Sequence, residues 1–250
     1  MSDWDPDQYA RNAAYVSELG VPVLNLLDPK PGERILDLGC GDGALTKELV
    51  ARGAQALGVD ASPDMVAAAR NMGVDAKCTD GENLPFRAEF NAVFTNAALH
   101  WMKHHARVVR GVWNALVNGG RFVGEFGGAG NIETIVITLD DALQKRGLSV
   151  PNPWNFPTAG QFKQLLEDTG FRNVHAESFP RPTPLPADLQ TWLRTFGKTF
   201  LAAVPEADRK AFMDEVADQL RPQLCDAQGN WVIDHVRLRF VALKPANNTQ

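Results

Sequence analysis

Three glycines at alternate positions, Gly39, Gly41 and Gly43, follow a short apolar run and precede a helical pattern. Glycines in such a loop let the backbone approach a ligand closely and turn directly into the helix. The next apolar run ends in Asp60, whose carboxylate can accept hydrogen bonds from both ribose hydroxyls of an adenosine. A strand, a glycine loop, a helix and an acidic residue in this order predict a nucleoside-binding site.

The glycine loop alone leaves two cofactors open. Gly39, Gly41 and Ala44 also satisfy the dinucleotide fingerprint G-x-G-x-x-G/A, so an NAD-linked oxidoreductase is an alternative function. Asp37 and Asp42 flank the loop, and their carboxylates would repel a pyrophosphate. The same two charges favour the sulfonium and ammonium groups of S-adenosylmethionine. Charge therefore favours S-adenosylmethionine as the cofactor.

The residues around the loop alternate between apolar runs and helical patterns. The apolar runs are at residues 35–38, 56–59, 74–78, 92–95 and 121–126, and the helical patterns are at 44–51, 63–70 and 106–117. Ser62 followed by Pro63 predicts a helix start, and Gly119-Gly120 predicts the end of the helix before the last of these strands. The alternation predicts an α/β fold with a Rossmann-like, doubly wound and mostly parallel sheet, to which a helical cap is added.

The regular alternation is limited to the middle of the chain. We predict a single domain over residues 1–250, with an N-terminal helical lid at 1–33, a cofactor-binding core at 34–126 and a cap and insert region at 127–230. A core strand near residues 172–178 interrupts the insert, and a final strand is predicted at 231–242. The insert holds a proline-rich loop at 151–157, and long loops of this kind are often functional. The insert aromatics are candidates for pocket walls or for core packing: Trp154, Phe156, Trp192 and Phe196.

Composition and charge restrict the partners. The formal net charge of −5 gives no electrostatic reason to bind nucleic acid, so a small-molecule acceptor is expected. The three cysteines lie far apart and predict neither a disulfide framework nor a zinc cluster. His100, His104 and His105 have no carboxylate or cysteine partner at ligand spacing, so no metal site is predicted and they are interpreted as solvated helix histidines.

The apolar runs of the chain are all shorter than a membrane span, and the N-terminus is acidic and polar. We therefore expect a cytoplasmic protein with no membrane partner. Its oligomeric state is left open between a monomer and a homodimer.

Three motifs in order resemble class I S-adenosylmethionine-dependent methyltransferases, of the type 11 group, over nearly the whole chain. Residues 37–43 resemble the first motif of these enzymes, residues 58–62 the second, and residues 78–86 the adenine-binding segment. Residues 3–9, residues 95–101 and the C-terminal insert are similar to trans-aconitate methyltransferase and its relatives. That resemblance implies methylation of a carboxylate on a small acid.

The resemblance also implies roles for the matched residues. Asp60 would hold the ribose, Ala61 and Met65 would flank the adenine, Asp80 would accept from its amino group, and the backbone of Gly81 would donate to it. Tyr9 and Tyr15 would close over the cofactor, or else they only pack the lid. The predicted cofactor-binding residues are Tyr9, Tyr15, Asp37, Gly39, Gly41, Asp60, Ala61, Met65, Asp80, Gly81, Asn96 and Ala97.

The predicted catalytic residues are His100 and Trp101, which directly follow a strand. Ligands in open parallel sheets bind outside the carboxyl ends of the strands. The His-Trp pair is similar to that of juvenile hormone acid methyltransferase, which implies that the Trp101 indole holds an acceptor carboxylate. An ionised carboxylate needs only orientation, whereas a phenol would need a general base such as His100.

The sequence also fits two interpretations other than methyl transfer to a small acid. His100 and Trp101 are alternatively core residues that end the strand and pack the next helix. The chain as a whole is alternatively a protein that binds S-adenosylmethionine without transferring its methyl group. In the catalytic reading, the reaction converts S-adenosylmethionine to S-adenosylhomocysteine.

Overall fold

The structure is a computed structural model that describes residues 4–246, apart from the side chains of residues 7–10, 13 and 14. The described residues divide into two compact units. The first contains the residues up to Ala129, Trp154–Ser178 and the residues from Leu238 onward, and the second contains Gly130–Pro153 and Phe179–Arg237. No helix among the described residues is long and apolar enough to cross a membrane.

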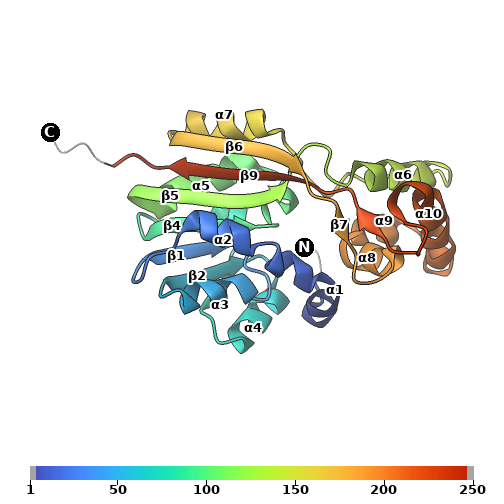
Figure 1. The fold of residues 1–250 in the computed structure, drawn as a ribbon, viewed down its shortest axis with the longest axis horizontal. Coiled ribbons are helices and arrows are strands. Elements are labelled where there is room, and N and C mark those ends of the chain that lie inside the picture. Colours follow the sequence, from blue (N-terminus) through green and yellow to red (C-terminus); the bar gives the residue numbers. More distant parts are fainter. Residues whose placement is uncertain (1–3, 247–250) are drawn as a thin grey trace. The chain divides into compact units, whose positions relative to one another are not determined.

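A seven-stranded sheet, drawn in Figure 1, forms the centre of the first unit. Its strands are β1 Arg34–Leu38, β2 Gln55–Asp60, β3 Ala76–Cys78, β4 Phe90–Asn96, β5 Leu116–Gly127, β6 Arg172–Pro180 and β9 Val236–Leu243. The order across the sheet is β3-β2-β1-β4-β5-β9-β6. The predicted α/β fold with a mostly parallel sheet is confirmed.

Parallel pairing brings the carboxyl ends of the central strands together. β1 pairs in parallel with β2 and with β4, and β4 pairs in parallel with β5. In this register Asp37 lies opposite both Gly58 on β2 and Phe94 on β4. The glycine loop after β1, Asp60 at the end of β2 and Asn96 at the end of β4 therefore meet at one edge of the sheet.

The last strand of the chain runs against this direction. The amide nitrogen of Gly119, near the start of β5, donates to the carbonyl oxygen of Lys244, and Lys244 donates back to Gly120. The start of β5 thus lies beside the end of β9, so the two strands are antiparallel. This pairing also corrects a boundary, because the helix predicted to end at Gly119-Gly120 ends at Ala115 and both glycines belong to β5.

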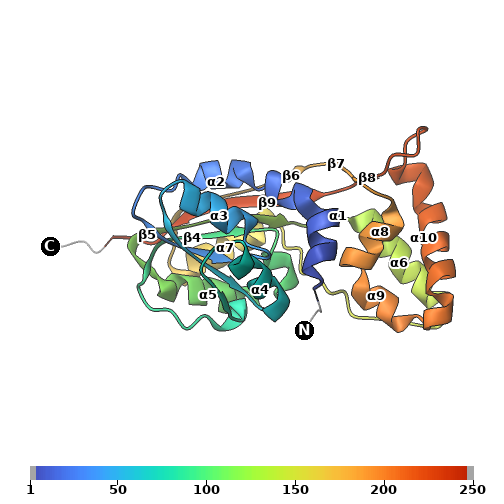
Figure 2. The ribbon, with the colours of Figure 1, turned by 90° about the horizontal axis from the view of Figure 1, so that it is seen from below.

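Helices cover both faces of the sheet. The helices of the first unit are α1 Pro6–Glu18, α2 Val21–Leu27, α3 Ala44–Ala51, α4 Pro63–Asn71, α5 His105–Ala115 and α7 Ala159–Thr169, with short 3-10 helices η1 Gly81–Asn83 and η2 Leu99–Trp101. Helices α2 and α3 pack with Ile35, Phe94 and Val123 on one face. Helices α5 and α7 pack on the other face, and Figure 2 shows α2 and α5 on opposite sides of the strands.

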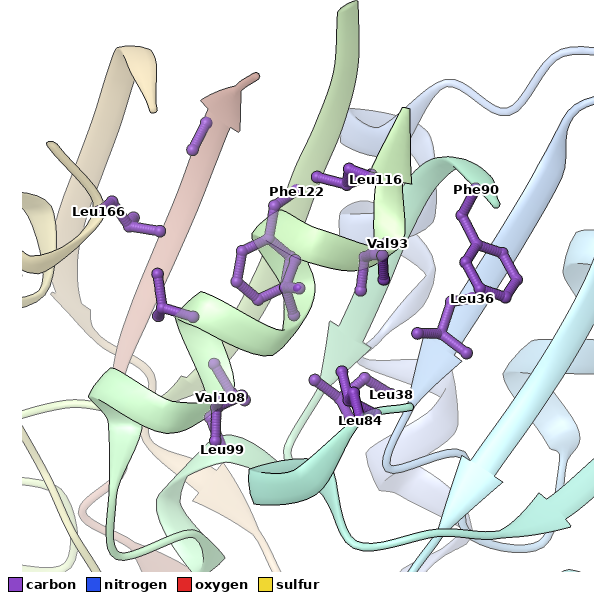
Figure 3. Close-up of a cluster of buried hydrophobic side chains, with 14 of the residues drawn as sticks. Leu36, Leu38, Leu84, Phe90, Val93, Leu99, Val108, Leu116, Phe122 and Leu166 are labelled. Atoms are coloured by element: carbon purple, nitrogen blue, oxygen red, sulfur yellow. The ribbon is translucent and has the colours of Figure 1, made fainter. Parts of the chain in front are cut away.

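The larger core lies between the sheet and helices α5 and α7. In Figure 3, Leu36, Val93 and Phe122 extend from three neighbouring strands toward Val108 of α5 and Leu166 of α7. All five side chains are fully buried. Burial of each such side chain stabilises the fold by about 1.5–3 kcal/mol. This core fixes the strand ends from which the site residues extend.

Local signals set the helix boundaries that matter for the site. The Ser62 hydroxyl accepts from the amide of Met65, and Pro63 occupies the first turn, so α4 begins where the sequence predicted. Helix α7 begins with a capping box between Thr158 and Gln161. These caps satisfy amide groups that would otherwise have no partner in the first turn.

The second unit is mainly helical. It contains α6 Glu133–Gln144, α8 Leu189–Phe196, α9 Lys198–Ala203, the 3-10 helix η3 Glu206–Asp208 and α10 Arg209–Leu224, with a small hairpin of β7 Thr183–Pro184 and β8 Val232–Ile233. Trp192, which is buried, and Phe196 pack against each other with their ring centroids 5.3 Å apart.

Candidate active site

The glycine loop adopts a backbone that requires glycine. Gly39, Gly41 and Gly43 have φ angles of +76°, +56° and +86°, in the left-handed region that other residues rarely enter. A Cβ at Gly39 would lie 2.2 Å from the Cβ of Ala98, which is far inside van der Waals contact. The loop therefore lies directly against the chain that leaves β4.

Asp60 ties the end of β2 to this loop. Its Oδ2 accepts from the amide of Gly41 at 3.0 Å, and its Oδ1 accepts from the amide of Ser62 at 2.9 Å. Burial raises the pKa of the Asp60 carboxyl, and these backbone hydrogen bonds act in the opposite direction. Each oxygen keeps a second lone pair, so the carboxylate can hold the loop and still accept from a bound ligand.

Asp37 lies beneath the loop and is almost completely buried, with 2% exposure. Its Oδ2 accepts a hydrogen bond from the Thr46 hydroxyl at 2.7 Å. Burial, together with the nearby charges of Asp60 and Asp42, raises the pKa of Asp37 to about 7. A cation bound near Asp37 would relieve both effects, so the site favours a positively charged ligand.

Residues 78–86, the predicted adenine-binding segment, contain a hydrogen-bonded turn. Asp80 caps η1, accepting from the amide of Glu82 at 2.9 Å and from the side chain of Asn83 at 2.6 Å. A Cβ at Gly81 would lie 2.7 Å from the Met102 methyl carbon, so the turn is in close contact with the segment after η2. The amino-group contact predicted for Asp80 stays a prediction.

The end of β4 contains two unusual features. Ala97 has a φ of +54°, and such strained backbone persists at sites where the surroundings hold it in place. The Asn96 side-chain nitrogen donates to Val16 of α1 at 3.2 Å. Its Oδ1 is buried and has no hydrogen-bond partner within residues 4–246. A buried acceptor of this kind is a position where a ligand donor would be stabilised.

The remaining predicted cofactor residues lie in α1, in α4 and in the segment between β2 and α4. Tyr15 is on α1, which contacts α4 and is joined to β4 through Asn96, whereas the side chain of Tyr9 lies outside the described residues. Ala61 is exposed beside Asp60, and Met65 is buried in α4. The assignment of these residues to the cofactor stays a prediction.

A backbone hydrogen bond fixes the tautomer of His100. Its Nδ1 atom accepts a hydrogen bond from the amide of Gly127 at 3.2 Å, and the side chain is buried, with 8% exposure. Because an acceptor nitrogen carries no proton, the neutral ring has its hydrogen on Nε2. His100 can therefore donate a hydrogen bond through Nε2.

Aromatic rings surround this histidine. The Trp101 ring lies 5.5 Å from His100, 5.2 Å from Trp4 in a T-shaped arrangement and 5.7 Å from Trp154. Phe156 lies 5.8 Å from His100 and is nearly parallel to Trp154, at an interplanar angle of 15°. We call these five residues the aromatic cluster. All of them belong to the first unit.

The interpretation of the histidines as solvated helix residues is wrong for two of the three. His100 and His105 are buried, and only His104 is exposed. His105 donates through Nε2 to the carbonyl of Leu99 at 3.0 Å, and burial lowers its pKa. Within the described part of the chain, no group of three or more histidine, cysteine or acidic residues is arranged to hold a metal ion.

Several site residues were not found by sequence reasoning. Thr46, Gly127 and Trp4 contact the predicted site residues Asp37, His100 and Trp101. Thr46 lies one turn into the helix after the loop, on the side that faces back to β1, so its spacing could have signalled a contact with Asp37. Gly127 and Trp4 carry no such local signal.

Comparison with known proteins places the chain in a family. Residues 36–124 match the family described as methyltransferase domain. An uncharacterised methyltransferase of Schizosaccharomyces pombe is 37% identical over 255 residues, covering 96% of this chain and 98% of the relative. A trans-aconitate 2-methyltransferase of Mycobacterium marinum is 40% identical over 108 residues, covering 41% of this chain and 40% of that protein.

The fold is shared with a solved structure. Phosphoethanolamine N-methyltransferase 2 of Haemonchus contortus, in complex with phosphomonomethylethanolamine and S-adenosylhomocysteine, superposes with a TM-score of 0.61 at 20% identity. The match covers 91% of this chain and 53% of that chain. The sheet order and the glycine loop with its acidic strand end define a class I methyltransferase fold.

The chain belongs to the class I S-adenosylmethionine-dependent methyltransferases. It is an S-adenosylmethionine-dependent enzyme, and the NAD-linked oxidoreductase alternative is set aside.

Proposed function

We propose that this methyltransferase transfers the methyl group of S-adenosylmethionine to a carboxylate oxygen of a small acid, giving a methyl ester. The observation that carries the proposal is the hydrogen bond from the Gly127 amide to Nδ1 of His100. It places the ring proton on Nε2, so neutral His100 is a donor and not a base at that atom. A carboxylate needs donors, whereas a phenol would need a group that removes its proton.

The site residues divide between the two reactants. For the cofactor, Asp60 would bind the ribose, Asp37 would stabilise the positive charge, and Asn96 Oδ1 would accept from the ammonium group. The bound cofactor supplies a methyl carbon activated by the sulfonium. The fit rests on the close approach of Gly39 to Ala98, the burial of Asp37 and the Asn96 oxygen, which has no hydrogen-bond partner among the described residues. Helix α1 would act as a lid, because it is joined to β4 through Asn96 and Val16.

On the acceptor side, the chain's residues would orient and shield the carboxylate. Nε2–H of His100 and the indole N–H of Trp101 would each donate to the acceptor, which holds one carboxylate oxygen in line with the methyl carbon. The acceptor oxygen would form the new bond to carbon while the carbon–sulfur bond breaks and its electron pair stays on sulfur. The acceptor is ionised at neutral pH, so no proton has to move.

The similarity to the trans-aconitate 2-methyltransferase of Mycobacterium marinum, 40% identical over 108 residues, supports a small acid as acceptor. The chain spans less than half of that enzyme's length in the alignment, so the acid itself is not carried over. The division into an N-terminal lid at 1–33 and a cap at 127–230, and a state of monomer or homodimer, stay predictions.

The proposal is tested by incubating the purified protein with methyl-labelled S-adenosylmethionine and matched acceptor pairs. Each pair contains a carboxylic acid and its primary amide, which has the same shape but no ionised oxygen. Transfer to the acid and not to the amide supports the proposal. Phenols and amines are assayed in parallel, and transfer to one of these in place of every acid would contradict the proposal.

A further inference from the structure

Asn155 of the proline-rich loop makes backbone and side-chain hydrogen bonds to the candidate acceptor site. The backbone amide of Asn155 donates to the carbonyl of His100 at 2.9 Å. The side-chain nitrogen of Asn155 donates to the carbonyl of Lys103 at 3.1 Å and faces Nδ1 of His105 at 3.4 Å. Asn155 therefore spans the segment that begins at His100 and ends in the first turn of α5.

The ring of His105 provides an acceptor for the side chain of Asn155. Its Nε2 donates to the carbonyl of Leu99, so Nδ1 of the neutral ring is an acceptor that fits the Asn155 amide. Burial lowers the pKa of His105, which keeps the ring neutral at physiological pH. The ring is also packed edge-on against Phe126 and Phe162, each with centroids less than 6 Å away, at 5.5 and 5.7 Å. The acceptor for Asn155 is thus fixed by the core.

The residues on either side of Asn155 belong to the aromatic cluster. Trp154 packs on Trp101, and Phe156 packs on His100. The hydrogen bonds of Asn155 consequently set how these two rings stand against the two predicted catalytic residues. Aromatic rings provide an apolar surface with a preference for flat or unsaturated groups.

We propose that Asn155 is a positioning residue for acceptor selectivity, because its hydrogen bonds to the His100–His105 segment hold Trp154 and Phe156 as the walls that select an acid with an apolar, unsaturated body. This inference rests on the proposed carboxylate methylation and names the substrate class within it. Asn155 does not touch the reacting atoms in this account.

The test compares two acids of different body chemistry. The S-adenosylhomocysteine complex is titrated calorimetrically with cinnamate, an apolar unsaturated monocarboxylate, and with trans-aconitate, a polar tricarboxylate. In Asn155→Asp the side chain keeps its shape but loses the donor to Lys103 and His105. Asn118→Asp is the matched control, since Asn118 is exposed at the start of β5, away from the carboxyl ends of the strands where the site lies.

The wild-type complex is expected to bind cinnamate at least about tenfold more tightly than trans-aconitate, and Asn155→Asp is expected to reduce this ratio by about tenfold. The affinity of Asn155→Asp for S-adenosylhomocysteine should match that of Asn118→Asp. Equal ratios in Asn155→Asp and the wild type, or a wild-type preference for trans-aconitate, would overturn the inference.

A second variant keeps the inference testable if Asn155→Asp unfolds. Phe156→Leu retains apolar volume but removes the ring that faces His100, so cinnamate should bind more weakly while S-adenosylhomocysteine binding is unchanged. Unchanged cinnamate affinity in Phe156→Leu would also overturn the inference. If the wild type binds cinnamate as expected but esterifies no acid, the proposed function fails and the selectivity inference stands on binding alone.

Discussion

The hydroxyl of Thr46 donates a 2.7 Å hydrogen bond to Asp37, and this pair is buried beneath the glycine loop with 0% and 2% exposure. Asp37 thus has one neutral partner and two acidic neighbours, Asp60 and Asp42, which together with burial raise its pKa to about 7. The raised value lies above the unfolded value of 3.8, so the contribution of this group to stability is fully present below pH 3.8 and is lost as the pH rises through 7.

The affinity for a cationic cofactor should have the opposite pH dependence. Because S-adenosylmethionine stabilises the ionised form of Asp37, its affinity should rise as the pH increases through about 7, and binding near that pH should release a proton. Calorimetric titrations in two buffers of different ionisation enthalpy measure the proton release. Asp37→Asn should bind more weakly and release fewer protons. An identical proton count in this variant and the wild type would contradict the role of Asp37.

Asp60 is expected to contribute to cofactor binding through charged hydrogen bonds. Asp60→Ala should weaken S-adenosylmethionine binding by about 2 kcal/mol, or roughly 30-fold in Kd. The control is Asp64→Ala, which removes an exposed carboxylate in the first turn of α4. If Asp60→Ala binds the cofactor as tightly as this control, the ribose assignment is wrong.

The two predicted catalytic residues should affect turnover and not cofactor affinity. Trp101→Phe keeps a ring in the aromatic cluster but removes the indole donor, and loss of one hydrogen bond to a charged group should lower kcat/KM by about 10- to 100-fold. His100→Gln retains a donor near the Nε2 position, so it should keep more activity than His100→Asn. Steady-state rates with an authenticated acid measure both effects. Equal turnover in Trp101→Phe and the wild type would return Trp101 to a packing role.

The second unit should respond to acid through His235. Burial, followed by the charges of Arg237 and Arg181, lowers the pKa of His235 to about 3, below the unfolded value of 6.5. The contribution of neutral His235 to the free energy of unfolding is therefore fully present above pH 6.5 and is lost as the pH falls toward 3. Between pH 6.5 and pH 5 the free energy of unfolding should fall by about 2 kcal/mol because of this group. Urea unfolding of wild type and His235→Gln at both pH values measures it, and an equal drop in both proteins would exclude His235 as the cause.

Sequence reasoning predicted the parts of the molecule that local signals specify. The glycine loop and Asp60 could be placed because a tight turn needs glycine and a strand end presents the next side chain to the ligand edge. Helix α4 begins at Pro63, as predicted, because Ser62 caps its start and proline fits the first turn. Both features depend on neighbours in the chain.

The parts that were missed depend on contacts across the fold. The burial of His100 and His105 follows from Gly127, Leu99 and the packing of α5, which no periodicity of the histidines shows. Gly119-Gly120 has the sequence of a helix end, but pairing with Lys244 extends β5 over it. Asn155 looks like one residue in a proline-rich loop, and only the fold brings it to Lys103 and His105.

The most direct test of the central claim is the chemical nature of the methylated product. Methyl-labelled S-adenosylmethionine is incubated with the protein and a mixture of small carboxylic acids, and the product is treated with mild base before the label is located. A methyl ester releases its label as methanol, which is the result predicted for transfer to a carboxylate. Label that stays attached after base treatment, as in a phenol ether or an N-methylamine, would contradict the proposed acceptor class.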